Sequence, residues 1–149
     1  SELAHIDLPC SHLLVIENEQ CRYQLPALDN SIAILGAGLN LNWLANSYFQ
    51  QKKIAYWGDI DSWGLKMLAH ARDRQKQLTP LLMTQNCFNR YQSYTVIEPK
   101  NAGEQTPENL TREEKKLYQT LLNCSKGRLE QEFIPADVVK KTILDWHSH

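Results

Sequence analysis

Short apolar runs that stop at glycine or acidic residues dominate the first half of the chain. One covers residues 13–16 and ends at Glu17, a second covers residues 31–35, and a third covers residues 54–57. A continuous apolar run of this length, bounded by turn residues, is typical of a strand buried on both faces of a sheet. We therefore predict three strands here and a fourth over residues 81–83.

Helical spacing of apolar positions separates these runs. Residues 41–51 have such spacing, and Ser62 can cap a second helix that runs to about Arg74. Strands that alternate with helices pair in parallel through right-handed crossovers. The first half of the chain thus predicts an α/β fold with a mainly parallel sheet flanked by helices.

The second half has a different pattern. Residues 98–110 are rich in Pro, Asn, Gly and Glu, which is typical of an exposed loop. Thr111 and Glu114 have the spacing of a helix capping box, so a helix should run from there to about Asn123. Pro135 can open a final helix that has an apolar side.

Size and composition fit one compact unit. The chain has 149 residues, 42% of them hydrophobic, and we expect residues 1–149 to form a single domain. It begins with Ser1 rather than Met, which favours a piece of a longer protein. No apolar run approaches the roughly 20 residues that span a bilayer, and no secretory pattern is present. The four cysteines lack C-x-x-C or zinc spacing, so we expect reduced thiols in a cytoplasmic protein.

The net charge argues against a chain that binds DNA without help from another domain or subunit. The formal net charge is −1 at pH 7, whereas a stand-alone nucleic-acid binder usually has a clear basic excess. Any DNA contact would therefore draw on another domain or subunit. Several basic positions could touch phosphates, although a charged surface explains them as well. They are Lys52, Lys53, Arg72, Arg74 and Lys76.

Acidic residues gather where the predicted strands end. Glu17 and Glu19 follow the first strand, and Asp59 and Asp61 follow the third. The carboxyl ends of parallel strands form the ligand-binding edge of an open sheet. If the first and third strands are neighbours, these carboxylates converge at that edge.

Converging carboxylates favour a hard metal ion. They repel one another, and burying them without compensation is costly. Mg²⁺ removes that conflict because it takes oxygen ligands, and next to a phosphate it activates water and stabilises the leaving oxygen. An Asp-x-Asp pair alone is weak evidence, since such pairs are common on solvated loops. Its position directly after an apolar strand and before a helix strengthens it.

Two segments resemble motifs of a known family. LVIENE at residues 14–19 resembles the first Toprim motif, and YWGDIDSWG at residues 56–64 resembles the second, as found in topoisomerase VI A subunits and their meiotic Spo-type relatives. The chain is more similar still to the C-terminal domain of JetD, the nuclease subunit of the Wadjet plasmid-defence system. That resemblance covers nearly the whole chain and includes residues 36–38, 110–114 and 128–132.

The resemblance implies a Toprim-like fold and a role for each acid. Glu17 would be the acid of the first motif, and Asp59 and Asp61 would bind Mg²⁺ or Mn²⁺. Glu19 would be an alternative ligand or would support one from behind. All four are counted among the candidate catalytic residues.

A later motif, RLEQE at residues 128–132, is ambiguous. By resemblance, Glu130 or Glu132 would reach the catalytic site, and Arg128 would lie near a phosphate. By pattern alone, the same run looks like the charged face of an ordinary helix.

Three further residues are candidate DNA contacts beside Arg128. Gly36 and Gly38 would form the tight turn after the second strand. Trp63 directly follows the acidic motif, and it could either stack on a base or pack against the protein. Trp43, Trp57 and Trp146 are better explained as core residues. 

The implied activity is hydrolysis of DNA phosphodiesters within an SMC-type Wadjet complex. The tyrosine nucleophile of topoisomerase VI resides in a separate winged-helix domain for which this chain has no room, so metal-activated water fits better. Double-stranded DNA and the SMC-type subunits would be partners. A homodimer would supply two sites for two strands. The turn at residues 36–38 is too short for a P-loop, so we expect no nucleotide cofactor.

Two alternatives remain open. The chain could be a Toprim scaffold that docks DNA or partner subunits without cutting. A phosphotransfer enzyme of the haloacid-dehalogenase or receiver type fits less well, because its key Asp follows the first strand, where this chain has Glu17.

Overall fold

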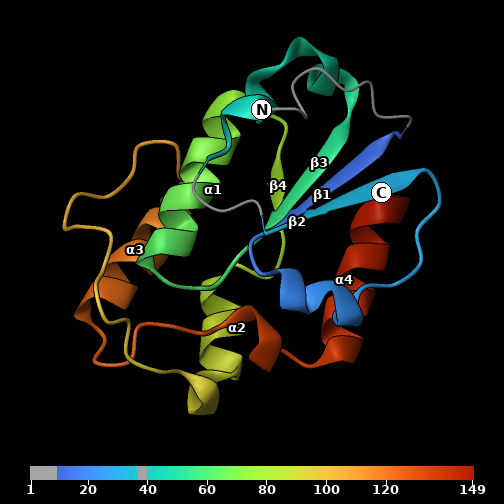
Figure 1. Ribbon diagram of the computed structural model, residues 1–149. Coiled ribbons are helices and arrows are strands. Elements are labelled where there is room, and N and C mark those ends of the chain that lie inside the picture. The colour runs from blue at the N-terminus through green and yellow to red at the C-terminus, as the bar shows by residue number, and fades with distance from the viewer. Residues whose placement is uncertain (1–9, 37–39) are drawn as a thin grey trace.

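The sheet is parallel and has four strands in the order β2-β1-β3-β4 (Figure 1). We describe a computed structural model that covers residues 10–36 and 40–149. The strands are β1 (His12–Ile16), β2 (Ser31–Leu35), β3 (Lys53–Trp57) and β4 (Thr79–Pro80). β1 and β3 are neighbours, as the convergence of the acidic residues requires.

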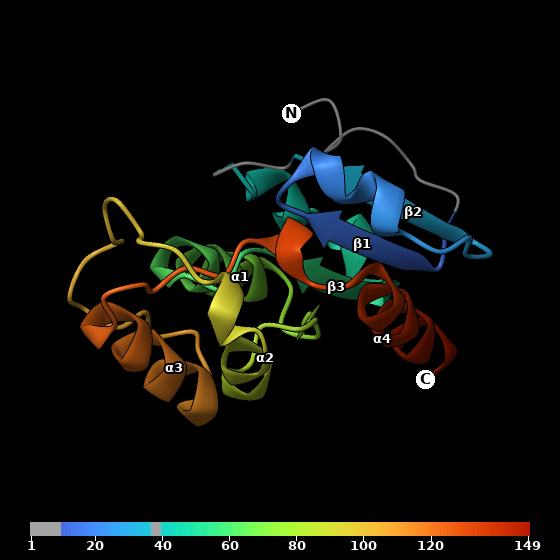
Figure 2. The same cartoon turned by 90° about the horizontal axis from the view of Figure 1, so that it is seen from below.

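Helices flank the sheet. They are α1 (Ser62–Arg74), α2 (Gln85–Arg90), α3 (Arg112–Asn123) and α4 (Ala136–Ser148). In Figure 1, α1 and α3 lie to the left of the sheet, beyond β4, and α4 lies on the right, below β1 and β2. Figure 2 shows α1 and α3 towards one end of the molecule, α2 near its middle and α4 towards the other end. This is the α/β Toprim-like arrangement that the sequence predicts.

The core is built from the apolar runs. Leu13, Val15, Ile16 and Ile54 have no exposed surface, whereas the edge strand β2 is only half-buried. Trp43, Trp57 and Trp146 are all buried, as expected for core residues. All four cysteines are free thiols. Within residues 10–36 and 40–149, none of the helices has the length and apolar character that a bilayer span requires.

The helix predicted over residues 41–51 is wrong. Two short 3₁₀ turns, Asn42–Ala45 and Ser47–Gln51, take its place. Asn46 has extended backbone angles, and its side-chain oxygen accepts the N–H of Tyr48 at 2.9 Å. Because asparagine offers its own side chain to the backbone in this way, it ends one turn and starts the next.

The fourth strand lies two residues earlier than predicted, at Thr79–Pro80. Leu81 still donates its N–H to the carbonyl of Tyr56 at 2.9 Å. Leu82 then adopts a φ of +64°, a left-handed conformation that turns the chain away from the sheet. The apolar residues 81–83 therefore belong to a turn.

Candidate metal centre

The sheet register brings the first and third acidic segments to one edge. Ile16 of β1 pairs with Trp57 of β3, and the N–H of Glu17 donates to the Trp57 carbonyl at 3.1 Å. The N–H of Asp59 in turn lies 3.3 Å from Oε2 of Glu17. Asp59 is only 8% exposed, Asp61 is 4% exposed, and Glu17 is half-buried. The structure thus brings these three carboxylates together out of solvent.

A long-range backbone pairing fixes the Asp-x-Asp segment. Ile60 forms an antiparallel bridge with Leu129, with two N–H to carbonyl bonds of 2.9 Å. Both residues are buried, so the apolar side chain between the two acids anchors the segment in the core. Successive side chains of an extended chain point to opposite sides, so Asp59 and Asp61 both face away from Ile60. The same bridge carries residues 128–132 to the acids.

The Gln131 side chain forms hydrogen bonds to the ends of both β1 and β3. The sequence had instead indicated Arg128, Glu130 and Glu132 as site residues. Gln131 is fully buried; Nε2 donates to the Trp57 carbonyl at 3.0 Å, and Oε1 accepts the N–H of Asn18 at 3.0 Å. Its own N–H donates to Oδ1 of Asp59 at 2.8 Å. Gln131 therefore positions Asp59 and fixes the backbone beside Glu17. Only its place within the RLEQE motif could have pointed to it.

Asp61 caps α1, whereas Ser62 was the predicted cap. Oδ1 of Asp61 accepts the N–H of Gly64 at 2.6 Å. A carboxylate here interacts favourably with the helix dipole. Gly64 is required because a Cβ on it would lie 1.9 Å from the carbonyl oxygen of Asp59.

Glu98 is an acid that sequence reasoning missed. It lies in the loop after η5 (Gln92–Tyr94), and its Oε1 accepts the hydroxyl of Ser62 at 2.6 Å. Its charge contributes to the raised pKa of Asp61, so it belongs to the same electrostatic group. No local pattern marks it, since the loop reads as exposed and polar.

Arg128 supplies positive charge against the two aspartates. Its Nη2 lies 3.7 Å from Oδ2 of Asp59, and its Nε lies 3.3 Å from Oδ2 of Asp61. Residues 128–130 are extended rather than helical, and η6 (Gln131–Phe133) is a single short turn. The interpretation of this run as a charged helix face is therefore wrong, because backbone pairing with Ile60 and Val96 holds it extended.

The negative charge that these acidic groups would carry if all were ionised exceeds the positive charge beside them. Burial, followed by the neighbouring charge of Asp59, raises the pKa of Glu17 to about 8. Burial also raises the pKa of Asp61 to about 7, although the N–H of Gly64 acts in the opposite direction. Partial desolvation, followed by a hydrogen bond with Glu130, raises the pKa of Glu132 to about 7, although most of that side chain is exposed. Near neutral pH, the centre therefore retains protons that a bound cation would displace.

The other predicted site residues are distributed around this group. Glu132 is exposed and accepts Nδ2 of Asn18 at 2.5 Å, while Glu130 is half-buried and precedes the short turn η6. Glu19 is exposed and lies over Gly36, which has a φ of +65°. The tight turn at residues 36–38 stays a prediction. Gly38 lies outside the described residues.

Trp63 packs against the neighbouring loop. Its ring nitrogen donates to the carbonyl of Lys100 at 2.8 Å, and the ammonium of Lys66 lies 5.1 Å from the ring centre. The indole is half-buried. The ring N–H of Trp63 is therefore used in packing against the protein, which was one of the two predicted roles.

The donor chemistry fits a hard divalent cation. The ligand atoms on offer are carboxylate oxygens, partly desolvated and short of positive charge, which suits Mg²⁺ or Mn²⁺. Among the described residues, however, no three His, Cys, Asp or Glu side chains already stand where they could hold one ion together. Arg128 lies against two of the acids, so an ion held by them would need that side chain to move.

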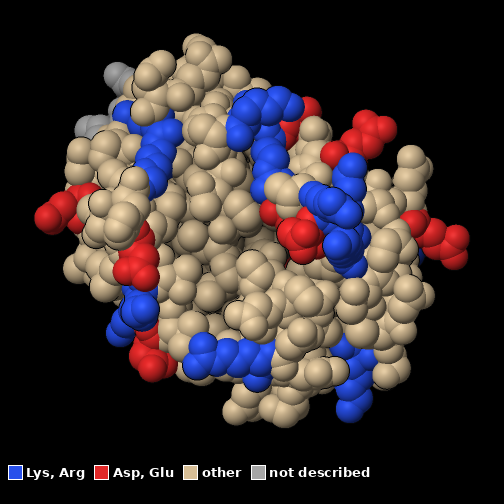
Figure 3. Space-filling model, turned by 180° about the vertical axis from the view of Figure 1, so that it is seen from behind, with Lys and Arg blue, Asp and Glu red and all other residues tan. Residues whose placement is uncertain are grey.

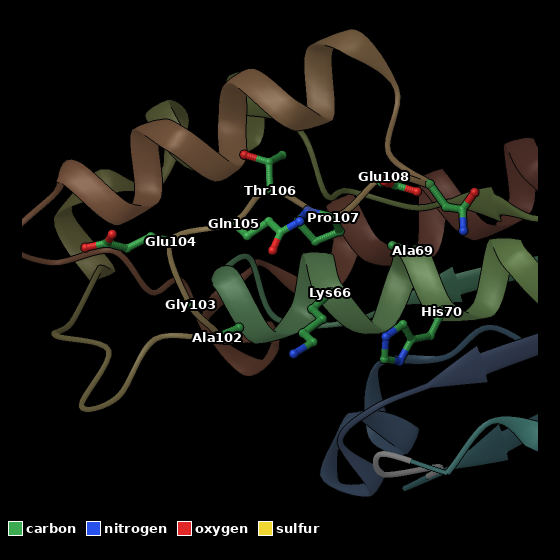
Figure 4. A pocket seen from close by; sticks show the side chains of 11 residues that line it. Lys66, Ala69, His70, Ala102, Gly103, Glu104, Gln105, Thr106, Pro107 and Glu108 are labelled. Atoms are coloured by element: carbon green, nitrogen blue, oxygen red, sulfur yellow. The ribbon is translucent and has the colours of Figure 1, made fainter.

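A separate cavity of about 480 Å³ lies between α1 and the loop at residues 102–109 (Figure 4). Lys66 and His70 line it from α1, and the loop closes the other side. None of the acids of the metal centre lines it. Unlike the group formed by Glu17, Asp59 and Asp61, the residues that line this cavity include no buried acidic side chain.

Comparison with known proteins identifies the family of the chain. No curated protein matches the chain. A family model described as Wadjet protein JetD, C-terminal, matches residues 1–143. The match includes both acidic segments and the RLEQE motif. The chain therefore belongs to the family of Wadjet JetD C-terminal domains.

Proposed function

We propose that this chain hydrolyses DNA phosphodiesters with Mg²⁺ or Mn²⁺, as the nuclease part of an SMC-type Wadjet complex. The observation that carries the proposal is the convergence of Glu17, Asp59 and Asp61 at the carboxyl edge of β1 and β3. Membership of the JetD family supports the same assignment. Buried carboxylates with raised pKa values are common at functional sites and less common at purely structural ones.

Glu17, Asp59 and Asp61 would hold the ion. When bound, it lowers the pKa of water and stabilises the leaving oxygen. The protein supplies the geometry: Gln131 and Gly64 each hold one carboxylate oxygen in place through a backbone N–H, at 2.8 Å from Asp59 and 2.6 Å from Asp61. Arg128, beside both aspartates, is suited to bind a phosphate oxygen of the substrate.

Binding of double-stranded DNA would depend on partner subunits. On the face seen in Figure 3, lysines and arginines form separate groups with acidic side chains among them, and a broad uncharged area lies between the groups. Several basic side chains are already engaged: Lys52 donates to the Cys10 carbonyl, and Arg72 pairs with Glu114. A net charge of −1 gives little general attraction for DNA. We therefore propose that SMC-type subunits or a second copy of the chain complete the DNA-binding surface.

The test uses asparagine rather than alanine. Asp61 caps α1 and Asp59 accepts the N–H of Gln131, so alanine would also remove structural hydrogen bonds, whereas asparagine keeps an acceptor oxygen. We expect Asp59→Asn/Asp61→Asn to abolish Mn²⁺ binding in a calorimetric titration of the chain. In the assembled complex, the same variant should assemble normally and leave closed circular plasmid uncut. Cleavage at the wild-type rate by a correctly assembled variant complex would contradict the proposal.

A non-cutting docking module is the second candidate function. Two observations favour it: Arg128 already lies against two acids, and among the described residues no three ligating side chains are placed to hold one ion. This candidate predicts that the asparagine variant assembles and supports plasmid cleavage as the wild type does. The plasmid assay therefore separates the two functions directly.

A further inference from the structure

We propose that Arg128 is a displaceable counter-ion that occupies the metal-binding side of Asp59 and Asp61 and must leave them when a divalent cation binds. This rests on the proposed metal site and adds a competing residue to it. Arg128 would thereby set the metal affinity of the chain without being a ligand.

Each of the two aspartates has one oxygen that accepts a backbone N–H and one oxygen that faces Arg128. Oδ1 of Asp59 accepts the N–H of Gln131, and Oδ1 of Asp61 accepts the N–H of Gly64. Both Oδ2 atoms face the guanidinium of Arg128, at 3.7 Å and 3.3 Å. An ion held by both aspartates while their structural hydrogen bonds stay intact would lie on the side of the carboxylates that Arg128 faces. It would therefore meet Arg128 at close range, where two positive charges repel strongly.

Charge rather than hydrogen bonding holds Arg128 in place. Its Nε is buried and has no hydrogen-bond partner, even though it lies 3.3 Å from Oδ2 of Asp61. A well-formed guanidinium–carboxylate pair has two hydrogen bonds of about 2.7–2.9 Å. A buried N–H without an acceptor is destabilising, so this contact is easily exchanged for a better one.

The Arg128 side chain can move away from the aspartates without a change in the backbone. Arg128 is 32% exposed at its side chain. Its main chain is fixed by two bonds to Val96, of 2.8 Å and 3.1 Å. Rotation of the side chain alone would release both aspartates. The freed guanidinium would remain beside the site, where a substrate phosphate could take the place of the carboxylates.

The test is Mn²⁺ binding to the chain and to Arg128→Met, measured by calorimetry at fixed pH. Removing a positive charge next to the ion should tighten binding at least about tenfold, because like charges at a few ångströms interact strongly even in a partly solvated site. Arg112→Met, at the exposed start of α3, is the matched control for the loss of one arginine charge. It should leave the affinity within about twofold of the wild type. Without metal, Arg128→Met should melt at a lower temperature, and its melting temperature should rise more with Mn²⁺ than that of the wild type.

Equal or weaker Mn²⁺ binding by folded Arg128→Met would overturn the proposal, as would the absence of binding by both proteins. The plasmid assay with Asp59→Asn/Asp61→Asn remains an independent test of the nuclease function. If Arg128→Met does not fold, the wild-type chain still gives an answer through the Nε–H resonance of Arg128 in a Mg²⁺ titration. Displacement predicts a large shift that saturates with the metal, and an unchanged resonance at saturating Mg²⁺ would refute it.

Discussion

Two arginines pair with buried carboxylates in this molecule, and they do so in different ways. Arg72 on α1 and Glu114 on α3 form a two-pronged pair, with hydrogen bonds of 2.6 Å and 2.9 Å. Arg128 faces two aspartates at 3.3 Å and 3.7 Å, and its buried Nε lacks a hydrogen bond. The first contact has one positive charge for one carboxylate. The second has one positive charge for a larger group of acids.

The difference separates structural charges from charges available for chemistry. Although burial alone would raise the pKa of Glu114, the hydrogen bonds and charge of Arg72 outweigh it, so the pKa is lowered. At the proposed metal centre, burial and neighbouring acids raise the pKa of Glu17 to about 8. Glu114 also completes the capping box of α3 by accepting the N–H of Thr111 at 2.9 Å. A fully satisfied pair holds helices together, whereas a group of acids with too little positive charge is where we propose that a cation binds.

The largest expected effect is on the structural pair. Arg72→Met leaves the carboxylate of Glu114 buried without its partner, and breaking such a pair typically costs about 3 kcal/mol or more. We expect that loss in urea unfolding of the chain, with no more than a twofold change in the Mn²⁺ affinity of the folded variant. The double variant Arg72→Met/Glu114→Gln should recover part of the stability, because no uncompensated charge remains. If Arg72→Met lowered the free energy of unfolding by less than about 1 kcal/mol, the Arg72–Glu114 pair would not be a strong structural contact, and the contrast with Arg128 would fail.

The next effect is a pH dependence of opposite sign in the two regions. The folded-state pKa of Glu17 is about 8, above its ordinary value of 4.5, so its contribution to stability is complete below pH 4.5 and is lost as the pH rises through 8. The pKa of Glu114 is lowered, so its contribution is present above pH 4.5 and is lost as the pH falls through the folded-state value.

Urea unfolding in a metal chelator between pH 5 and pH 8.5 measures this dependence. We expect the wild-type chain to lose about 1–2 kcal/mol over that range and Glu17→Gln to lose less, since its amide does not titrate. Saturating Mg²⁺ should also flatten the wild-type profile, because the ion takes over the neutralising role of the proton. If the stability of Glu17→Gln depended on pH as that of the wild type does, a group other than Glu17 would be responsible for the pH dependence.

Local sequence patterns captured the sheet and the placement of Glu17, Asp59 and Asp61, because strand ends follow from short apolar runs and the carboxyl edge follows from parallel pairing. They did not capture Glu98 or the holding role of Gln131. Both depend on contacts between segments far apart in the chain, namely Ser62 with Glu98 and Asp59 with Gln131. No periodicity encodes such contacts, and only resemblance to a family motif drew attention to residues 128–132.

The helix ends show the same limit at shorter range. The capping box at Thr111 and the proline before α4 were both found where predicted, because each depends on residues within one turn. The failure over residues 41–51 also has a local cause, since apolar spacing alone does not reveal that Asn46 would bond the backbone. Asp61 caps α1 instead of the predicted Ser62, whose hydroxyl donates to the distant residue Glu98 at 2.6 Å.

The smallest expected effect distinguishes the two glutamates that follow β1. Glu17 lies among the buried acids, whereas Glu19 is exposed beside Gly36 at the end of β2. Glu19→Gln should change the Mn²⁺ affinity less than twofold, because an exposed charge outside the cluster is well screened. Glu17→Gln should weaken the affinity at least about tenfold, since it removes a ligand charge from a desolvated site. Both variants keep a side-chain oxygen and nearly the same size. A large loss of affinity with Glu19→Gln would mean that residues 17–19 rearrange on metal binding and that the second acid joins the ion's ligands.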